Sequence, residues 1–553
     1  MKITRHFVRV GEREVHYRCA GSGPPFVLFH VSPQSSSFVL PELLSLADRY
    51  TLVALDTPGY GDSDPLPLPA PNMADYADAV IETLEALGID RAPLYGSHTG
   101  ANIAVEVARR APQRVAALVL DGLSLSTPEV AHDRINHYAP RFEPTADGGH
   151  LAWAWQHTRD QLLFWPWYQP HKANRLHADV KNAGYLHDVV LGKMAAADYW
   201  LGYRAAFGHD SRDALKQVTI DTFFVTADAD AHTAIERSLP DLPDNIRFVD
   251  TTADTQLDAI RTVLSSVEHS GVFQPPEEPE HRPGLYRSMI KVGDGQRLVQ
   301  RGGPNQGQPL VLLHGGMGTS ASIADRAAAF AASRPVFSLD IAGTGDSDPL
   351  SQANASIDAF ADDVCAVLVA CGVDTFDLYG ESGGATLAAA VAGKTSNQVG
   401  KLILDRPEFP DDEHKDGLIS NIAPAIEATW DGTHFLTAWH MLRDAALFWP
   451  WYNRTRDNVR DIEPDIEPAA LQARLVAWLK GRLTYGDYMR STLSADLGSL
   501  LQSVSQPVLV FGTAGDQLES HAHKTANALN TAELHITDQL RAPTSAMAAF
   551  LSA

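Results

Sequence analysis

Cysteine, basic side chains and long apolar runs are all scarce in this chain of 553 residues. Its three cysteines (Cys19, Cys365 and Cys371) have neither the spacing of metal ligands nor that of a disulfide framework, which suits a reducing, cytoplasmic environment. Lys and Arg total 44 against 68 Asp and Glu, and a net charge of −24 argues against nucleic acid as a partner. No apolar run approaches the ~18 residues of a membrane span, so we expect no membrane partner.

What the chain does contain is one sequence pattern written twice. Leu94–Ala101 reads LYGSHTGA, and Leu378–Ala385 reads LYGESGGA. His98 and Ser382 occupy the same place in the two copies, 284 residues apart, and the same offset relates His30 to His314. One constant offset between pairs of residues this far apart in the sequence indicates a duplicated domain.

The boundary between the copies is a stretch rich in proline and glutamate. Residues 274–284 have a composition that cannot form a packed core, so we expect a linker there. The sequence therefore predicts domains at 1–273 and 285–553. A two-fold dimer interface can survive fusion of its protomers, so we expect the halves to form an internal pseudo-dimer, with further homo-oligomerisation left open.

Each half alternates short apolar runs with segments of helical period. The predicted strands are 26–29, 52–55, 92–95 and 117–120 in the first half, and 310–313, 336–339, 376–379, 402–404 and 508–511 in the second. Between the last two predicted strands of the second half, and at the matching place in the first, lies a long segment containing Phe-Trp-Pro-Trp-Tyr. This pattern predicts an α/β fold, a mostly parallel twisted sheet flanked by helices with an inserted helical cap.

The motif Gly380-Glu381-Ser382-Gly383-Gly384 follows a predicted strand and opens a predicted helix. A serine on such a sharp turn needs small neighbours, which explains the flanking glycines. His314-Gly315-Gly316-Met317-Gly318 follows the first buried strand, and a D-x-x-G-x-G-x-S turn starts at Asp340. Together these features resemble the α/β-hydrolase fold superfamily, and the resemblance covers both halves.

The resemblance implies a nucleophile at Ser382 and an oxyanion site formed by the backbone N–H groups of Gly383 and Gly316, in the segment that begins with His314. Asp516 matches the usual acid, and Asp405 is the alternative. The implied function is a cofactor-independent hydrolase, without a metal, that cleaves an ester, lactone, thioester or C–C bond of a small organic molecule.

One member of the expected triad is missing. The superfamily places its histidine in a loop after the last strand, but there the chain has only His535, within the strand itself. His434, at the start of the cap, could serve as the proton shuttle, and His150 is its counterpart in the first half. His521 and His523, shortly after Asp516, are further candidates.

The first half departs from the pattern in another way, because it has imidazole at the nucleophile position. His98 is followed by Thr99, Ser32 lies in the oxyanion-type segment, and Asp230 falls near the acid position. An imidazole titrates near neutrality and can act as acid or base. The alternatives to a hydrolase are therefore a lyase or other acid/base enzyme that uses His98 or His434, and a binding protein that has lost catalysis.

The cap repeats a pair of side chains four residues apart. Trp155 with Arg159, and Trp439 with Arg443, would each share one face of a helix. Arginine beside tryptophan could bind the carboxylate of an apolar acid substrate. The alternative is an ion pair between each arginine and a neighbouring acidic residue.

Overall fold

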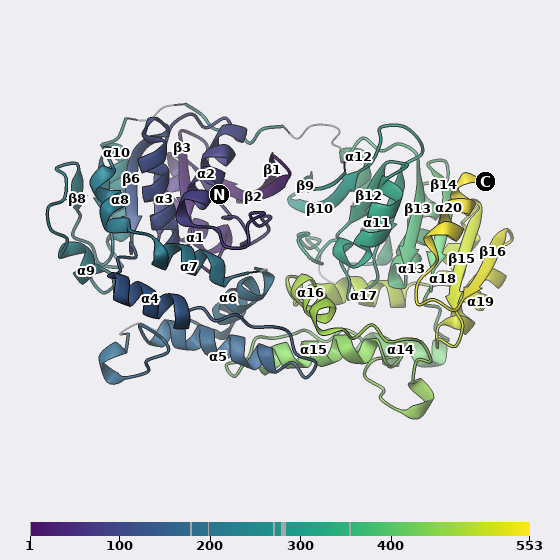
Figure 1. The fold of residues 1–553 in the computed structure, drawn as a ribbon. Coiled ribbons are helices and arrows are strands. Elements are labelled where there is room, and N and C mark those ends of the chain that lie inside the picture. The colour runs from purple at the N-terminus through teal and green to yellow at the C-terminus, as the bar shows by residue number, and fades with distance from the viewer. Residues whose placement is uncertain (1, 177–179, 197, 269–270, 278–283, 353–354) are drawn as a thin grey trace. The chain divides into compact units, whose positions relative to one another are not determined.

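The computed structural model describes residues 2–176, 180–196, 198–268, 271–277, 284–352 and 355–553 (Figure 1). The chain divides into two compact units, one made of Met1–Glu143 and His150–Glu278, the other of Pro144–Gly149 and Pro279–Ala553. Residues 278–283 of the expected linker lie outside the described part of the chain.

The sheet of the first unit has eight strands in the order β1-β2-β4-β3-β5-β6-β7-β8. Strands β1 and β2 form an antiparallel hairpin, β2 pairs antiparallel with β4, and every later pairing is parallel. The strands are β1 (Thr4–Val10), β2 (Arg13–Ala20), β3 (Pro25–Phe29), β4 (Thr51–Leu55), β5 (Ala92–Ser97), β6 (Val115–Asp121), β7 (Thr222–Phe224) and β8 (Ile246–Phe248).

The sheet of the second unit has the same topology, in the order β9-β10-β12-β11-β13-β14-β15-β16. Its strands are β9 (Leu285–Val292), β10 (Gly295–Gly302), β11 (Leu310–Leu313), β12 (Val336–Leu339), β13 (Phe376–Glu381), β14 (Val399–Asp405), β15 (Val508–Thr513) and β16 (Ala532–Thr537). The prediction of two tandem, mostly parallel α/β domains is therefore confirmed.

Helices cover the sheets of both units (Figure 1). The first unit has α1 (Ser36–Glu42), α2 (Met73–Ala86), α3 (Thr99–Arg110), α4 (Pro128–His137), α5 (Gly149–Leu163), α6 (Ala183–Ala195), α7 (Trp200–Gly208), α8 (Ser211–Gln217), α9 (Thr233–Arg237) and α10 (Gln256–Ser265). The second has α11 (Ala324–Ala331), α12 (Ile357–Ala370), α13 (Gly383–Lys394), α14 (Asp412–Asn421), α15 (Thr433–Ala445), α16 (Pro468–Leu479), α17 (Tyr485–Ser494), α18 (Leu497–Gln502), α19 (Glu519–Asn527) and α20 (Thr544–Ser552). Short 3₁₀ helices span Leu44–Asp48, Pro112–Arg114, Lys172–Asn174, Ser320–Ile323 and Arg456–Asn458.

The central strands are buried along their whole length because helices lie on both faces of each sheet, which is why their sequences are continuously apolar. Helices α3 and α13 follow the two repeated turns and are buried almost throughout. The expected caps are helical insertions, α4 to α8 between β6 and β7, and α14 to α18 between β14 and β15. Within the described ranges, no helix combines the length and the apolarity needed to cross a bilayer.

Candidate active site

The two repeated turns have nearly the same backbone geometry. His98 has φ 49° and ψ −108°, Ser382 has φ 54° and ψ −125°, and each residue caps the helix that follows it. A backbone N–H···O bond of 2.8 Å joins each of them to the end of the neighbouring strand, from His98 to Asp121 and from Ser382 to Asp405. A positive φ at a non-glycine residue is strained, and such strain persists where the surrounding structure enforces it, often at functional sites.

Close packing explains the glycines on either side of Ser382. A Cβ atom at Gly380 would lie 2.2 Å from the carbonyl oxygen of Gly384. A Cβ atom at Gly384 would lie 2.6 Å from the carbonyl oxygens of Leu313 and His314, at the end of β11. The turn therefore packs directly against the strand that precedes the oxyanion-type segment.

We expect Gly384→Ala to destabilise the second unit by about 1–3 kcal/mol, because the new methyl group overlaps backbone atoms that cannot rotate away. Thermal unfolding followed by circular dichroism would measure this. Gly417→Ala is the matched control, since a Cβ atom at this helical glycine of α14 meets nothing within 4 Å. The control is expected to be neutral or slightly stabilising, and equal destabilisation by both changes would contradict the packing explanation.

Ser382 lies in a cavity of about 200 Å³ between the strand ends and the cap. Its hydroxyl donates a hydrogen bond to the carboxyl group of Glu408. Glu408 lies in the loop after β14, where Arg406 has a positive φ of 50°. Burial raises the pKa of Glu408 above its ordinary value, and the hydrogen bond from Ser382 and the nearby guanidinium groups of Arg406 and Arg460 only partly oppose that rise.

The oxyanion-type segment lies next to the serine. Gly316 lines the cavity, and a Cβ atom at Gly315 would lie 3.1 Å from Ser382 Cβ. Gly383 begins helix α13 directly after Ser382. His314 is fully buried and hydrogen-bonds through Nε2 with Thr344 and the Ile341 backbone N–H. Its ring therefore stabilises the turn that follows β12. Burial lowers the pKa of His314 to about 4, which keeps the ring neutral.

Asp516 occupies the expected acid position after β15, but its partner is an arginine. Arg460 donates two hydrogen bonds to the Asp516 carboxylate, of 3.1 Å from Nε and 2.7 Å from Nη2. Both side chains are buried, and Arg460 belongs to the cap. The loop after β16, the usual place of a triad histidine in the superfamily, presents Leu540 and Arg541 to the cavity.

We expect Arg460→Ala to destabilise the second unit by about 3–5 kcal/mol, because it leaves the Asp516 carboxylate buried without its counter-charge. Arg454→Ala is the matched control. Arg454 pairs with Asp444 at 2.6 Å, also within the cap, but its own side chain is half exposed, and exposed pairs contribute about 0–1 kcal/mol. Calorimetry of the full chain would compare the two variants, and similar losses would refute the special role of the buried pair.

None of the histidines proposed from sequence is among the described residues that line the Ser382 cavity. His434 is buried at the start of α15 and accepts a hydrogen bond of 3.1 Å from the Thr429 backbone N–H, and burial lowers its pKa to about 4. His521 accepts a hydrogen bond from the Phe409 backbone N–H. Three further candidates also lie elsewhere: His150 is buried at the start of α5, His523 is exposed beside Glu519, and His535 is exposed on β16.

Within the described residues, the tryptophan–arginine pairs of the caps do not line the cavity at either repeated turn. Trp155 and Trp439 are buried in the described structure. Neither these tryptophans nor Arg159 and Arg443 are among the described residues that line the cavities at His98 and Ser382. The cap instead contributes Trp165 to the first-unit cavity, and Trp449, Trp451 and Arg460 to the second-unit cavity.

The first unit has its own cavity at the repeated turn, with a volume of about 460 Å³. Its lining includes four residues singled out from the sequence, Ser32, His98, Thr99 and Asp230. His98 Nε2 lies 3.6 Å from Asp230 Oδ2. His232, which also lines the cavity, places Nδ1 2.9 Å from Asp230 Oδ1, and the rings of His98 and His232 meet edge to face at 4.8 Å.

Charge is unevenly distributed over this cavity. Burial opposes ionisation of Asp230, but the hydrogen bond from His232 and the nearby His98 outweigh it and hold the pKa of Asp230 below its ordinary value. Burial lowers the pKa of His232, so this imidazole is neutral at neutral pH. Asp121, at the end of β6, accepts a hydrogen bond of 2.8 Å from Tyr95, and burial raises its pKa to about 6.

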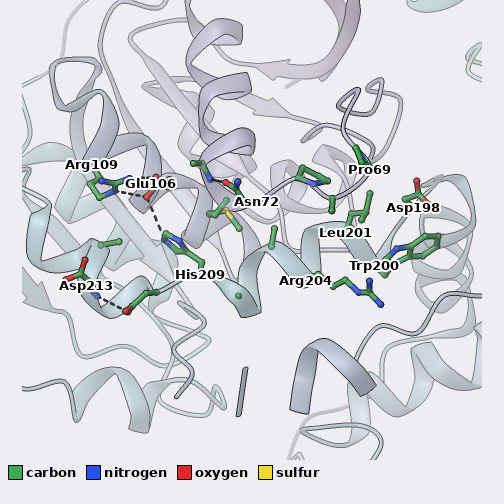
Figure 2. Close-up of a pocket in the computed structure, with 18 of the residues that line it drawn as sticks. Pro69, Asn72, Glu106, Arg109, Asp198, Trp200, Leu201, Arg204, His209 and Asp213 are labelled. Carbon is green, nitrogen blue, oxygen red and sulfur yellow. Dashed lines mark hydrogen bonds and ion pairs between the residues drawn. The ribbon is translucent and has the colours of Figure 1, made fainter. Parts of the chain in front are cut away.

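A larger cavity of about 960 Å³ lies elsewhere on the first unit (Figure 2). Three of its polar groups lie together: Arg109 donates to both carboxylate oxygens of Glu106, at 2.8 and 2.6 Å, and His209 lies 3.8 Å from the same carboxylate. Glu106 follows His98 by about 12 Å along helix α3, at 1.5 Å per residue. This cavity is therefore separate from the repeated turn.

Sequence reasoning missed Glu408, Arg460 and His232. A weak signal existed for Glu408, because it follows the end of a parallel strand at the sheet edge where Ser382 lies. His232 stands two residues after Asp230 and could have been weighed with it. For Arg460 the sequence offers no signal, since it reaches Asp516 from a distant part of the cap.

The chain belongs to the alpha/beta hydrolase fold family, whose model matches residues 24–247 and 308–538. It is 37% identical over 115 residues to the dihydrolipoyllysine-residue acetyltransferase component of the acetoin cleaving system of Cupriavidus necator, a match that covers 21% of this chain and 30% of that protein. It is 33% identical over 112 residues to the 2-(acetamidomethylene)succinate hydrolase of Mesorhizobium japonicum, covering 20% of this chain and 40% of that protein.

These matches span well under two thirds of either relative. Among solved structures, the enol-lactonase from Burkholderia xenovorans LB400 aligns with a TM-score of 0.36 and 20% identity, covering 47% of this chain and 98% of that one.

Proposed function

We propose that the chain is a hydrolase that cleaves an ester, thioester or lactone bond of a small molecule at Ser382, with Glu408 in place of the triad histidine. The observation that carries this proposal is a hydrogen bond: the hydroxyl of Ser382, which lies on the strained turn, donates to the Glu408 carboxyl group. The family and the hydrolase relative from Mesorhizobium japonicum support the reaction class.

In the proposed reaction, the Glu408 carboxylate accepts the proton of Ser382 while Oγ attacks the substrate carbonyl carbon. The N–H groups of Gly383 and Gly316 stabilise the negative oxygen that develops. Protonated Glu408 then donates its proton to the departing alcohol or thiol, leaving an acyl-serine. Water attacks the acyl group, Glu408 accepts a proton from that water, and the acid leaves as Ser382 regains its hydrogen.

The cavity favours a compact, negatively charged acyl group. About 200 Å³ is small for an organic substrate. Its lining contains four arginines, at positions 406, 460, 474 and 541, against three acidic side chains, Glu381, Glu408 and Asp465. Arg541 has the loosest pairing of the four, 3.7 Å from Glu381.

Labelling with a fluorophosphonate tests the proposal directly. We expect one adduct per chain, located by mass spectrometry on the peptide that contains Ser382, because these probes report an activated serine hydroxyl. Absence of labelling, or an adduct confined to the first unit, would overturn the assignment.

The acid/base alternative stays a prediction and has one observation in its favour. His98 Nε2 lies 3.6 Å from Asp230 Oδ2 in the cavity of the first unit, so a small side-chain movement would bring the two groups within hydrogen-bonding distance. Turnover of a substrate that is lost in His98→Ala and kept in Ser382→Ala would place the chemistry in the first unit. The internal pseudo-dimer also stays a prediction.

A further inference from the structure

Three potential metal ligands lie close together in the first-unit cavity at the repeated turn. His98, Asp230 and His232 each offer one ligand atom, and these three atoms all lie within 4.8 Å of one another. His98 comes from the turn before α3, whereas Asp230 and His232 come from the loop after β7, so two separate segments of the fold build the cluster.

The spacing of the cluster fits a bound ion. Zn²⁺ holds nitrogen and carboxylate oxygen ligands at about 2.0–2.2 Å, so neighbouring ligand atoms in a tetrahedral site are roughly 3.3 Å apart. His232 Nδ1 lies 2.9 Å from Asp230 Oδ1, and His98 Nε2 lies 3.6 Å from Asp230 Oδ2, so the two separations, each to a different oxygen of the carboxylate, lie on either side of that value. Small side-chain rotations would close the site.

The carboxylate is fixed in the orientation that such a site needs. The backbone N–H of His232 donates to Asp230 Oδ1 at 2.8 Å, which leaves Oδ2 directed toward His98. The His232 ring packs against Trp165 at 5.0 Å, and only about 5% of its side chain is exposed. Ligands whose orientation is held by outer contacts lose less freedom when they bind a metal.

The charge of Asp230 is balanced differently from that of Asp516. In the second unit the guanidinium of Arg460 neutralises the acid after β15. In the first unit, the ion pairs recorded for Asp230 among described residues involve His98 and His232 only, with no lysine or arginine. A divalent cation would supply the positive charge that Arg460 supplies in the second unit.

The pocket also contains polar groups suited to a further ligand. The hydroxyl groups of Ser32 and Ser124 line it, are buried, and have no hydrogen-bond partner within the described structure. Unsatisfied buried hydroxyls are costly, so a bound water or substrate oxygen is expected beside them. A site with three protein ligands leaves a coordination position open for such an oxygen.

We propose that His98, Asp230 and His232 bind one divalent transition-metal ion of the zinc type, with an open coordination position facing the pocket of the first unit. Two imidazole rings and a carboxylate form a donor set that such ions accept. The proposal concerns the first unit alone and does not depend on the reaction assigned to Ser382.

Titration of the full chain with Zn²⁺ after treatment with a chelator and dialysis tests the site. Calorimetry is expected to detect one ion per chain, and Co²⁺ in place of Zn²⁺ to give the visible absorption of a nitrogen- and oxygen-ligated site. His98→Ala, His232→Ala and Asp230→Asn should each weaken binding by at least ~100-fold, since loss of outer contacts alone costs 10–100-fold.

His137→Ala is the matched control, because His137 is an exposed histidine of the same unit that lies 3.1 Å from Asp133. It is expected to bind as the wild type does. Asp230→Asn keeps the size of the side chain and guards against misfolding of the alanine variants, which circular dichroism would reveal. Absence of binding to the wild type, or equal affinity in the control and the three ligand variants, would overturn the proposal.

Discussion

Ser382→Ala is expected to lower kcat/KM for ester hydrolysis by roughly 10³-fold or more, because loss of a nucleophile leaves only the weaker catalysis that binding and oxyanion stabilisation provide. The substitution removes the hydroxyl that bonds to Glu408 and keeps the turn. Steady-state rates with p-nitrophenyl and thioester acyl substrates would measure the effect.

Ser420→Ala is the control for this variant, since Ser420 is an exposed serine of the same unit whose hydroxyl donates to the Asp416 carbonyl oxygen. It should keep full activity. His98→Ala, assayed in parallel, should also keep it. Undiminished turnover in Ser382→Ala would refute the assignment of Ser382 as nucleophile.

Glu408→Gln is expected to reduce kcat by about 10²–10⁴-fold with little change in KM, the range that a general base contributes. The amide keeps the size of the side chain and can still accept the hydrogen bond from Ser382, but it cannot hold the transferred proton. Glu413→Gln, at an exposed position in the first turn of α14, is the matched control and should leave kcat unchanged. Equal rates in both variants would exclude Glu408 as the base.

The same residue sets an expected pH dependence. The carboxylate is the active form, and burial raises the pKa of Glu408, so kcat/KM should rise with pH through a value above the ordinary range of glutamate. The Gln variant should lack this acid limb. Because the folded state holds this proton more tightly than the unfolded state, its stabilising contribution is present at low pH. That contribution to the free energy of unfolding is lost as pH rises through the pKa of Glu408 in the folded state. In Glu408→Gln, which has no proton to lose at this position, this pH-dependent loss of stability should be absent.

The fold could be predicted closely because its signals are local. Strands β11 and β12 begin and end at the predicted residues, since buried parallel strands are apolar throughout. Helix α3 starts at Thr99, because the turn at His98 passes directly into the helix. The apolar pattern does not report that transition.

The site could be predicted only where a short motif defines it. The two turns at His98 and Ser382 are local, and glycine spacing indicates them. The contact between Ser382 and Glu408 depends on the path of the loop around Arg406, and the pairing of Arg460 with Asp516 joins residues far apart in the chain. The place of His434 at the start of the cap predicts a proton shuttle, but its ring accepts a hydrogen bond from the Thr429 backbone N–H.

The matching dihedral angles at His98 and Ser382 also matter for protein engineering. One backbone shape holds an imidazole in one copy and a hydroxyl in the other, so the shape is imposed by the flanking glycines and not by the side chain at its tip. Reactive groups could therefore be exchanged at this position without redesigning the scaffold. A chain with two such turns offers two independent places to do so.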